Sequence, residues 1–160
     1  MMRVAVLAMA AVLGAGRVAL AQVTSPGLRP ELRADVVAIG SRVAVQAGGG
    51  VQVPFGYYTR VGVIAAAGAD LGRFDQDASA RVDVIARFLF DPFRQQRWGV
   101  SAGGGVSARA VAGDKVRPYL VAVVDVEGRR LGSVSPALQL GVGGGVRVGI
   151  GLRWGAASSR

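Results

Sequence analysis

Apolar and polar residues alternate along most of the chain between residues 34 and 155. In the stretch that ends at Trp154, the side chains at every second position are apolar, with Gln, Arg and Gly between them. This alternation is typical of β-strands that have one apolar and one polar face. We therefore expect an all-β fold, with strands in six segments at residues 37–55, 59–69, 81–90, 98–109, 119–127 and 138–154.

Turn-forming residues separate these segments, for example Asp91-Pro92 and Gly113-Asp114. The connections are too short for the crossover that parallel strands need. The pattern therefore predicts a single antiparallel up-and-down β-barrel of six to eight strands at residues 34–155, with an extended lead-in at 22–33 and a tail at 156–160. Six strands is the direct count, and eight strands result if the first and last segments each contain two.

A glycine triplet followed by Val occurs three times, at residues 48–50, 103–105 and 143–145. In each case the apolar residues on the two sides of the triplet keep the same parity. A bend inside a continuous strand preserves this parity, and so does a three-residue turn. Because glycine kinks help a sheet to curve and close, we interpret the central glycines as strand bends: Gly49, Gly104 and Gly144.

The first 21 residues have the form of a secretory signal peptide. Arg3 gives a positive start, residues 4–16 are apolar, and Ala19-Leu20-Ala21 matches the small-residue pattern of a cleavage site. A membrane-spanning helix would need roughly 20 apolar residues, and Arg17 interrupts this stretch. We therefore expect export, with residues 1–21 removed.

The whole sequence has a formal net charge of +9, and loss of Arg3 and Arg17 with the signal peptide leaves +7. A basic chain can bind nucleic acid, but an exported protein rarely meets it, so no nucleic-acid partner is expected. Membrane lipid is the expected partner. Lipopolysaccharide is a candidate within that class, because its headgroup is anionic.

Aromatic residues make up only 6% of the sequence and stand near the ends of the predicted strands. Transmembrane barrels carry aromatic side chains at both membrane interfaces, whereas soluble proteins bury most large aromatics in the core. The positions therefore predict interfacial aromatics at the two rims of the barrel: Phe55, Tyr57, Tyr58, Phe90, Phe93, Trp98, Tyr119 and Trp154.

The last predicted strand ends in VRVGIGLRW, residues 146–154, with an apolar residue at every second position and a terminal aromatic. Together with the signal peptide and the preceding strands, it resembles the small outer-membrane β-barrel proteins of Gram-negative bacteria. The resemblance lies in the pattern rather than in a diagnostic motif. It implies insertion into the outer membrane, with the apolar face towards lipid and the Arg, Gln and Gly face inward.

Charged residues occupy the face opposite the apolar one, so a barrel would enclose them. Eight strands leave an interior that side chains just fill, and buried charges must be paired. We therefore expect an interior plugged by ion pairs, with a narrow anion-preferring pore as an alternative. The expected interior network comprises Arg42, Arg60, Arg81, Asp83, Arg87, Arg109, Asp125, Glu127, Arg147 and Arg153.

The sequence contains no His and no Cys, which removes Ser–His and Asp–His hydrolase machinery, the commonest zinc ligands and thiolate chemistry. Gly141 and Gly143 begin a dinucleotide-binding pattern, but residue 146 is Val and no helix is expected after it. The carboxylates at positions 70, 75 and 77 could offer oxygen ligands to calcium, although a solvated acidic turn is the simpler interpretation.

Asp125 and Glu127 share a face and could form a catalytic carboxylate pair, but ion pairing with interior arginines is favoured. We therefore expect no enzyme activity, no cofactor and no metal site. The expected function is a structural or interaction role in the outer membrane. The alternative is a soluble periplasmic barrel that binds a small amphiphilic ligand. Apart from Asp125 and Glu127, residues 119–127 are apolar on both faces, which suits a packed interior better than a wet channel.

Overall fold

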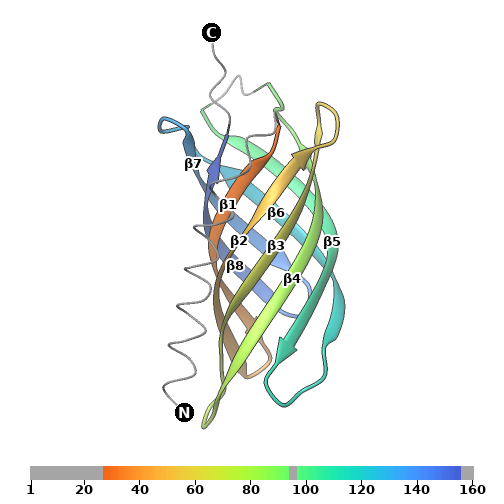
Figure 1. The fold of residues 1–160 in the computed structure, drawn as a ribbon, viewed down its shortest axis with the longest axis vertical. Coiled ribbons are helices and arrows are strands. Elements are labelled where there is room, and N and C mark those ends of the chain that lie inside the picture. Colours follow the sequence, from red (N-terminus) through yellow and green to blue (C-terminus); the bar gives the residue numbers. More distant parts are fainter. Residues whose placement is uncertain (1–26, 94–96, 156–160) are drawn as a thin grey trace.

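The alternating segments form a closed barrel of eight antiparallel strands in the computed structural model, which describes residues 27–93 and 97–155 (Figure 1). The prediction of an all-β up-and-down barrel is confirmed. The expected signal peptide and C-terminal tail lie outside the described residues. The strands are β1 (Arg29–Ile39), β2 (Arg42–Pro54), β3 (Thr59–Leu71), β4 (Gln76–Leu89), β5 (Gly99–Val111), β6 (Arg117–Glu127), β7 (Val134–Val142) and β8 (Val146–Trp154).

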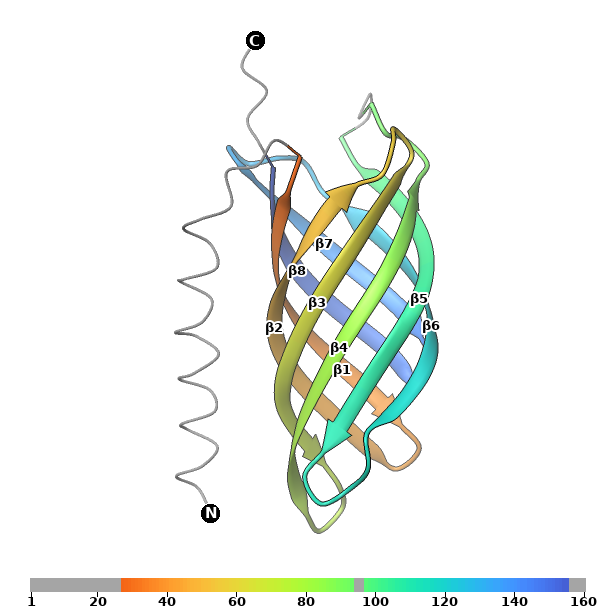
Figure 2. The same ribbon diagram turned by 45° about the vertical axis from the view of Figure 1, so that its right-hand side comes forward.

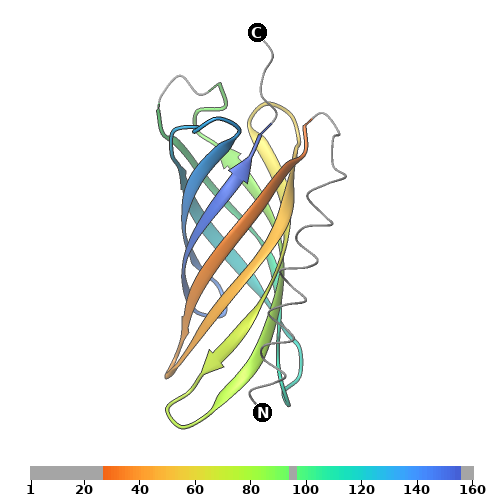
Figure 3. The same ribbon diagram turned by 60° about the vertical axis from the view of Figure 1, so that its left-hand side comes forward.

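Each strand pairs with the next, and β1 pairs with β8 to close the sheet, with Val36 opposite Val148. Figure 3 shows these first and last strands side by side in orange and blue. The start of β1, the end of β8 and the β2–β3, β4–β5 and β6–β7 connections lie at one end of the barrel (Figure 2). We call this the terminus end, and we call the opposite end, with the other four connections, the turn end.

The first predicted segment contains two strands, because Gly40 and Ser41 form a tight turn. A two-residue turn reverses parity, so Val37 faces inward opposite Ala44 while Val43 faces outward. The expectation that residues 37–55 share one apolar face is therefore wrong before the turn. The barrel also begins at Arg29 rather than at residue 34, within the expected lead-in.

The last predicted segment also contains two strands, and its glycine triplet is the turn between β7 and β8. Gly143, Gly144 and Gly145 have φ values of 137°, 65° and 145°, which side chains other than glycine rarely adopt. Because the turn has three residues, Val142 and Val146 keep the same parity and pair with each other. Gly144 is thus a turn residue, and its interpretation as a strand bend is wrong.

The other two triplets lie inside the continuous strands β2 and β5. The first and third glycines of each triplet face into the barrel, against the backbone of a neighbouring strand. A Cβ atom at Gly48 would lie 2.0 Å from the Ala65 carbonyl oxygen, and one at Gly105 would lie 1.9 Å from that of Val84. Gly49 and Gly104 face outward, where the nearest atoms would be 3.1 and 3.3 Å away. The close approach of neighbouring strands therefore depends on the first and third glycines of each triplet, not on the central ones.

Exchanging Gly105 for Ala is expected to lower the free energy of unfolding by at least about 1–3 kcal/mol, because its Cβ would overlap backbone that cannot rotate away. Gly104→Ala is the matched control, since its Cβ points outward and meets its nearest atom at 3.3 Å; its effect should stay below about 1 kcal/mol. Urea unfolding of both variants in detergent micelles measures the difference. Equal losses would show that close approach at residue 105 is unimportant.

Candidate functional site

The barrel places its charged residues inside. All ten residues expected in an interior network lie at inward-facing strand positions, and Asp83 and Asp125 are fully buried. Arg87 and Arg147 are also buried, although arginine has one of the longest side chains. These groups face one another across the lumen, and their contacts fall into four neighbouring clusters.

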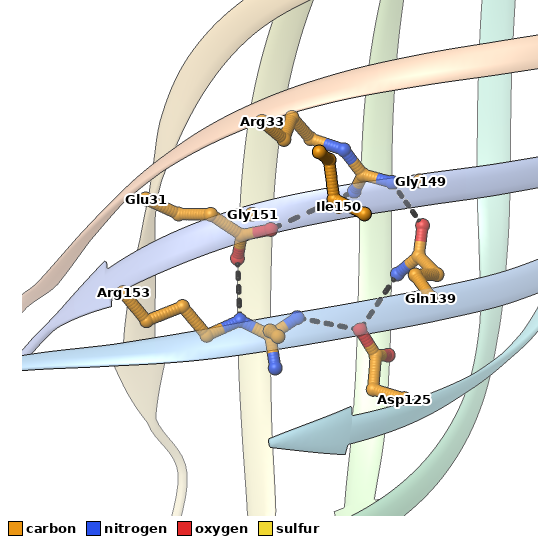
Figure 4. Close-up of a pocket in the computed structure, with 9 residues that line it drawn as sticks. Glu31, Arg33, Asp125, Gln139, Gly149, Ile150, Gly151 and Arg153 are labelled. Atoms are coloured by element: carbon orange, nitrogen blue, oxygen red, sulfur yellow. Dashed lines mark hydrogen bonds and ion pairs between the residues drawn. The ribbon is translucent and has the colours of Figure 1, made fainter. Parts of the chain in front are cut away.

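A closed ring of five side chains from four strands lies in the first cluster (Figure 4). Arg153 donates from Nη2 to Asp125 at 2.5 Å and from Nε to Glu31 at 3.0 Å. Gln139 donates to Asp125 at 3.0 Å and accepts a hydrogen bond from Arg33. Arg33 closes the ring through Glu31, with 3.7 Å between Nη1 and Oε1. The ring links four consecutive strands, β6, β7, β8 and β1, on the inner face of the barrel.

The second cluster contains two carboxylates shared between arginines. Asp83 accepts from Arg81 Nε at 3.1 Å and from Arg147 Nη1 at 2.7 Å, and its other oxygen accepts from Ser107 at 2.6 Å. Arg81 also donates to Asp35 at 2.5 Å. Each buried charge therefore has at least one opposite charge within hydrogen-bonding distance, as a low-dielectric interior requires.

The third cluster lies towards the terminus end and centres on Glu127. Arg29 donates to Glu127 at 2.7 Å, and guanidinium nitrogens of Arg153 and Arg60 lie 3.6 and 3.9 Å from it. Arg87 donates to Asp125 at 2.9 Å. Asp125 and Glu127, considered above as a catalytic pair, thus both serve as acceptors for interior arginines.

The fourth cluster lies at the turn end, where Arg42 contacts the three carboxylates considered as calcium ligands. Its nitrogens lie 3.1 Å from Asp70, 3.1 Å from Asp75 and 2.7 Å from Asp77. Arg109 donates to Asp70 from the other side. The cation among these carboxylates is therefore a guanidinium, and residues 27–93 and 97–155 contain no group of three or more acidic side chains arranged to hold a metal.

Apolar side chains also occupy part of the lumen. Ile85, Val121 and Val123 are buried against one another, facing inward from β4 and β6. At the turn end the lumen widens into an open cavity of about 510 Å³, whose lining includes Arg42, Asp70, Arg109, Lys115 and Tyr119.

Four interior residues on β1 were missed from the sequence: residues 29, 31 and 33 fall within the expected lead-in at 22–33, and residue 35 precedes the first expected strand segment at 37–55. The signal was present: outward Leu32, Ala34 and Val36 alternate with the inward charged residues. Glu31 and Asp35 supply carboxylates to the first two clusters, where they accept hydrogen bonds from Arg153 and Arg81. The missed residues are Arg29, Glu31, Arg33 and Asp35.

The outer face has the opposite character. None of the outward-facing positions of the eight strands carries a charged side chain, and the polar residues among them, Thr59 and Gln76, stand at strand ends. Large apolar side chains are exposed around the full circumference: Val36 is 47% exposed on β1, Val84 41% on β4 and Ile150 64% on β8. The barrel therefore presents a continuous apolar surface outside a charged interior.

Aromatic residues gather at one rim rather than at two. Seven of the eight expected interfacial aromatics lie at or beside the terminus end. There the rings of Tyr58 and Phe88 stack at 5.7 Å, and those of Tyr57 and Phe93 lie 6.2 Å apart. Tyr119 is the exception. It is half-buried and lines the cavity at the turn end, so its assignment to a lipid interface is wrong.

The sequence matches no known protein family, and no curated protein matches it. Among solved structures, the chain is similar to the solution NMR structure of the de novo designed protein TMB2.3, with a TM-score of 0.52 and 14% sequence identity. The alignment covers 85% of this chain and 98% of the designed chain. At this identity the likeness shows the fold: a small eight-stranded antiparallel barrel. Among the described residues, no helix is both long and apolar enough to cross a membrane.

Proposed function

We propose that this protein is a small barrel of the bacterial outer membrane with a structural or interaction role, and that its interior is closed by ion pairs. The observation that carries the proposal is the outer face. Its outward strand positions are free of charge around the whole circumference, while the arginines and carboxylates of the strands stand at inward-facing positions. A barrel in water would be expected to have the reverse distribution.

The extent of the apolar surface and the closure of the sheet favour a lipid environment. Monomeric soluble proteins rarely expose contiguous apolar patches larger than a few hundred Å², and this one surrounds the barrel. A closed sheet also leaves no unpaired strand edge, which the hydrocarbon region of a bilayer requires. The likeness to a designed transmembrane barrel and the signal-peptide pattern of residues 1–21 favour the same location.

The alternatives fit the interior less well. A soluble barrel that binds an amphiphile needs an apolar pocket, but here Asp83, Asp125 and Arg147 are buried inside the lumen. An anion pore needs a continuous wet path, but ion pairs and the Ile85–Val121–Val123 cluster fill the middle of the barrel. We therefore propose membrane lipid as the partner and no enzymatic reaction.

Cell fractionation tests the proposed location. The mature protein is expected in the outer-membrane fraction, to resist carbonate extraction, and to migrate faster on a denaturing gel when unboiled, because a closed barrel stays folded in detergent. A chain expressed without residues 1–21 is the control for export. Recovery of the full-length product from the soluble periplasm would reject the membrane assignment in favour of the soluble barrel.

Conductance of planar bilayers tests whether the interior is closed. The refolded protein is expected to give no steady conductance even at high salt, because paired charges and apolar side chains occupy the lumen. The measurement needs a parallel check, by the unboiled gel, that folded barrel is present in the bilayer preparation. A steady anion-selective current from folded protein would instead support the pore.

A further inference from the structure

The two ends of the barrel differ in their exposed side chains. Phe55, Tyr57, Phe93 and Trp98 are 62–79% exposed at the terminus end. At the turn end, Phe74 is the exposed aromatic residue among those described. The connections at the terminus end thus form an aromatic surface beyond the strand ends.

The exposed charges at the two ends differ as well. Those described at the terminus end are all positive: Arg97, Arg129 and Arg130. Its nearby carboxylates are less accessible, since Glu127 is buried beside Arg29 and Asp91 is half-buried. The turn end exposes side chains of both charges: Arg73, Lys115 and Arg117 are positive, and Asp75 and Asp114 are negative.

The arginines and aromatics of the terminus end form one surface. Arg97 precedes Trp98 in the chain, and the Trp98 ring lies over the β6–β7 connection, 3.4 Å from where a Cβ atom at Gly128 would stand. Arg129 and Arg130 follow directly. We call residues 55–58, 90–93, 97–98 and 128–130 the basic aromatic rim.

We propose that the basic aromatic rim binds the headgroup layer of anionic phospholipid and thereby orients the barrel, with the terminus end at the leaflet richer in such lipid. This inference rests on the proposed membrane location. Aromatic side chains favour the depth of the headgroups. Guanidinium groups pair with phosphate through two parallel hydrogen bonds, and a negatively charged lipid surface attracts each exposed cation.

The two tryptophans allow a direct test, because Trp98 and Trp154 are the only ones in the sequence and both lie at the terminus end. The full chain is refolded into vesicles of phosphatidylcholine and phosphatidylglycerol in a fixed ratio. One vesicle set carries bromine on the acyl chains of the first lipid, and a second set carries it on the other. Bromine quenches nearby tryptophan, so the ratio of the two quenching strengths reports which lipid surrounds the terminus end.

Phosphatidylglycerol is expected to be enriched about fivefold around the tryptophans, the effect of roughly one arginine at an anionic surface. The triple variant Arg97→Gln, Arg129→Gln, Arg130→Gln should reduce this enrichment to about the bulk ratio. The matched variant Arg73→Gln, Lys115→Gln, Arg117→Gln removes three exposed cations from the turn end and should leave it unchanged.

A reporter at the turn end completes the design. Phe74→Trp, combined with Trp98→Phe and Trp154→Phe, should show little enrichment of phosphatidylglycerol. Quenching by the two lipids in proportion to their bulk ratio in the wild-type protein would overturn the orientation proposal while leaving the membrane barrel intact. Quenching by neither lipid would instead reject the membrane location itself. Loss of the preference in millimolar inorganic phosphate would overturn the lipid surface in favour of a site for free phosphate.

Discussion

Replacing Val84 by arginine is expected to lower the free energy of unfolding in a bilayer by about 2–4 kcal/mol, the effect of a cation near the midplane on the lipid face of a barrel. Val84 faces outward near the middle of β4, is 41% exposed, and pairs with Val63 on one side and Val106 on the other. In a barrel surrounded by water the same change would alter stability by no more than about 0.5 kcal/mol. Urea unfolding of vesicle-embedded protein, followed by tryptophan emission, distinguishes the two.

Gln76→Arg is the matched control for this change. Gln76 lies on the same strand and the same outward face, but at the turn end. A cation there reaches the headgroup region, where the penalty falls to about 0–1 kcal/mol. Equal and small effects at both positions would contradict a lipid-facing outer surface, whereas a large loss at residue 84 alone would map the depth of the membrane along β4.

The facing of most strands could be predicted from the sequence, because alternation is a local property. On β4, Arg81, Asp83 and Arg87 alternate with Val82 and Val84 and lie inside as expected. The turn at Gly40 and Ser41 could not be found in this way. Val37 faces inward and Val43 faces outward, but both are apolar and both stand at odd positions, so the alternation in the sequence continues across the turn. The number of strands therefore remained open between six and eight.

The missed turn in the last segment also explains the error about the aromatic rims. If residues 138–154 formed one strand, Trp154 would lie at the opposite end from Tyr57 and Trp98. The turn at Gly143–Gly145 sends β8 back, so Trp154 joins them at the terminus end. The missed turn therefore placed Trp154 at the wrong end of the predicted barrel.

The partners within the interior could not be predicted, because they depend on strand register and closure. Arg153 and Glu31 are 122 positions apart in the sequence, and they meet only because β8 pairs with β1. The sequence predicts that inward charges must be paired, but it does not say which carboxylate each arginine contacts. The closed ring that includes Gln139 forms only in the assembled barrel.

Exchanging Asp125 for Asn is expected to lower the free energy of unfolding by about 3–5 kcal/mol, because removal of one partner leaves buried charge without compensation. Asp125 is fully buried and accepts hydrogen bonds from Arg87, Arg153 and Gln139. Arg153 retains Glu31 and Glu127. In this variant, Arg87 keeps at most a hydrogen bond to the amide oxygen at position 125. Its two terminal nitrogens have no hydrogen-bond partner among the described residues.

Asp114→Asn provides the matched control, because Asp114 forms an exposed ion pair with Arg117 at 2.7 Å in the β5–β6 connection. Exposed pairs contribute at most about 1 kcal/mol, so this variant should unfold at nearly the wild-type urea concentration. The double variant Arg87→Met, Asp125→Leu removes both buried charges and should regain most of the loss, since apolar pairs can replace buried ion pairs at little cost. Equal losses in Asp125→Asn and Asp114→Asn would show that the interior ion pairs stabilise the barrel no more than an exposed pair does.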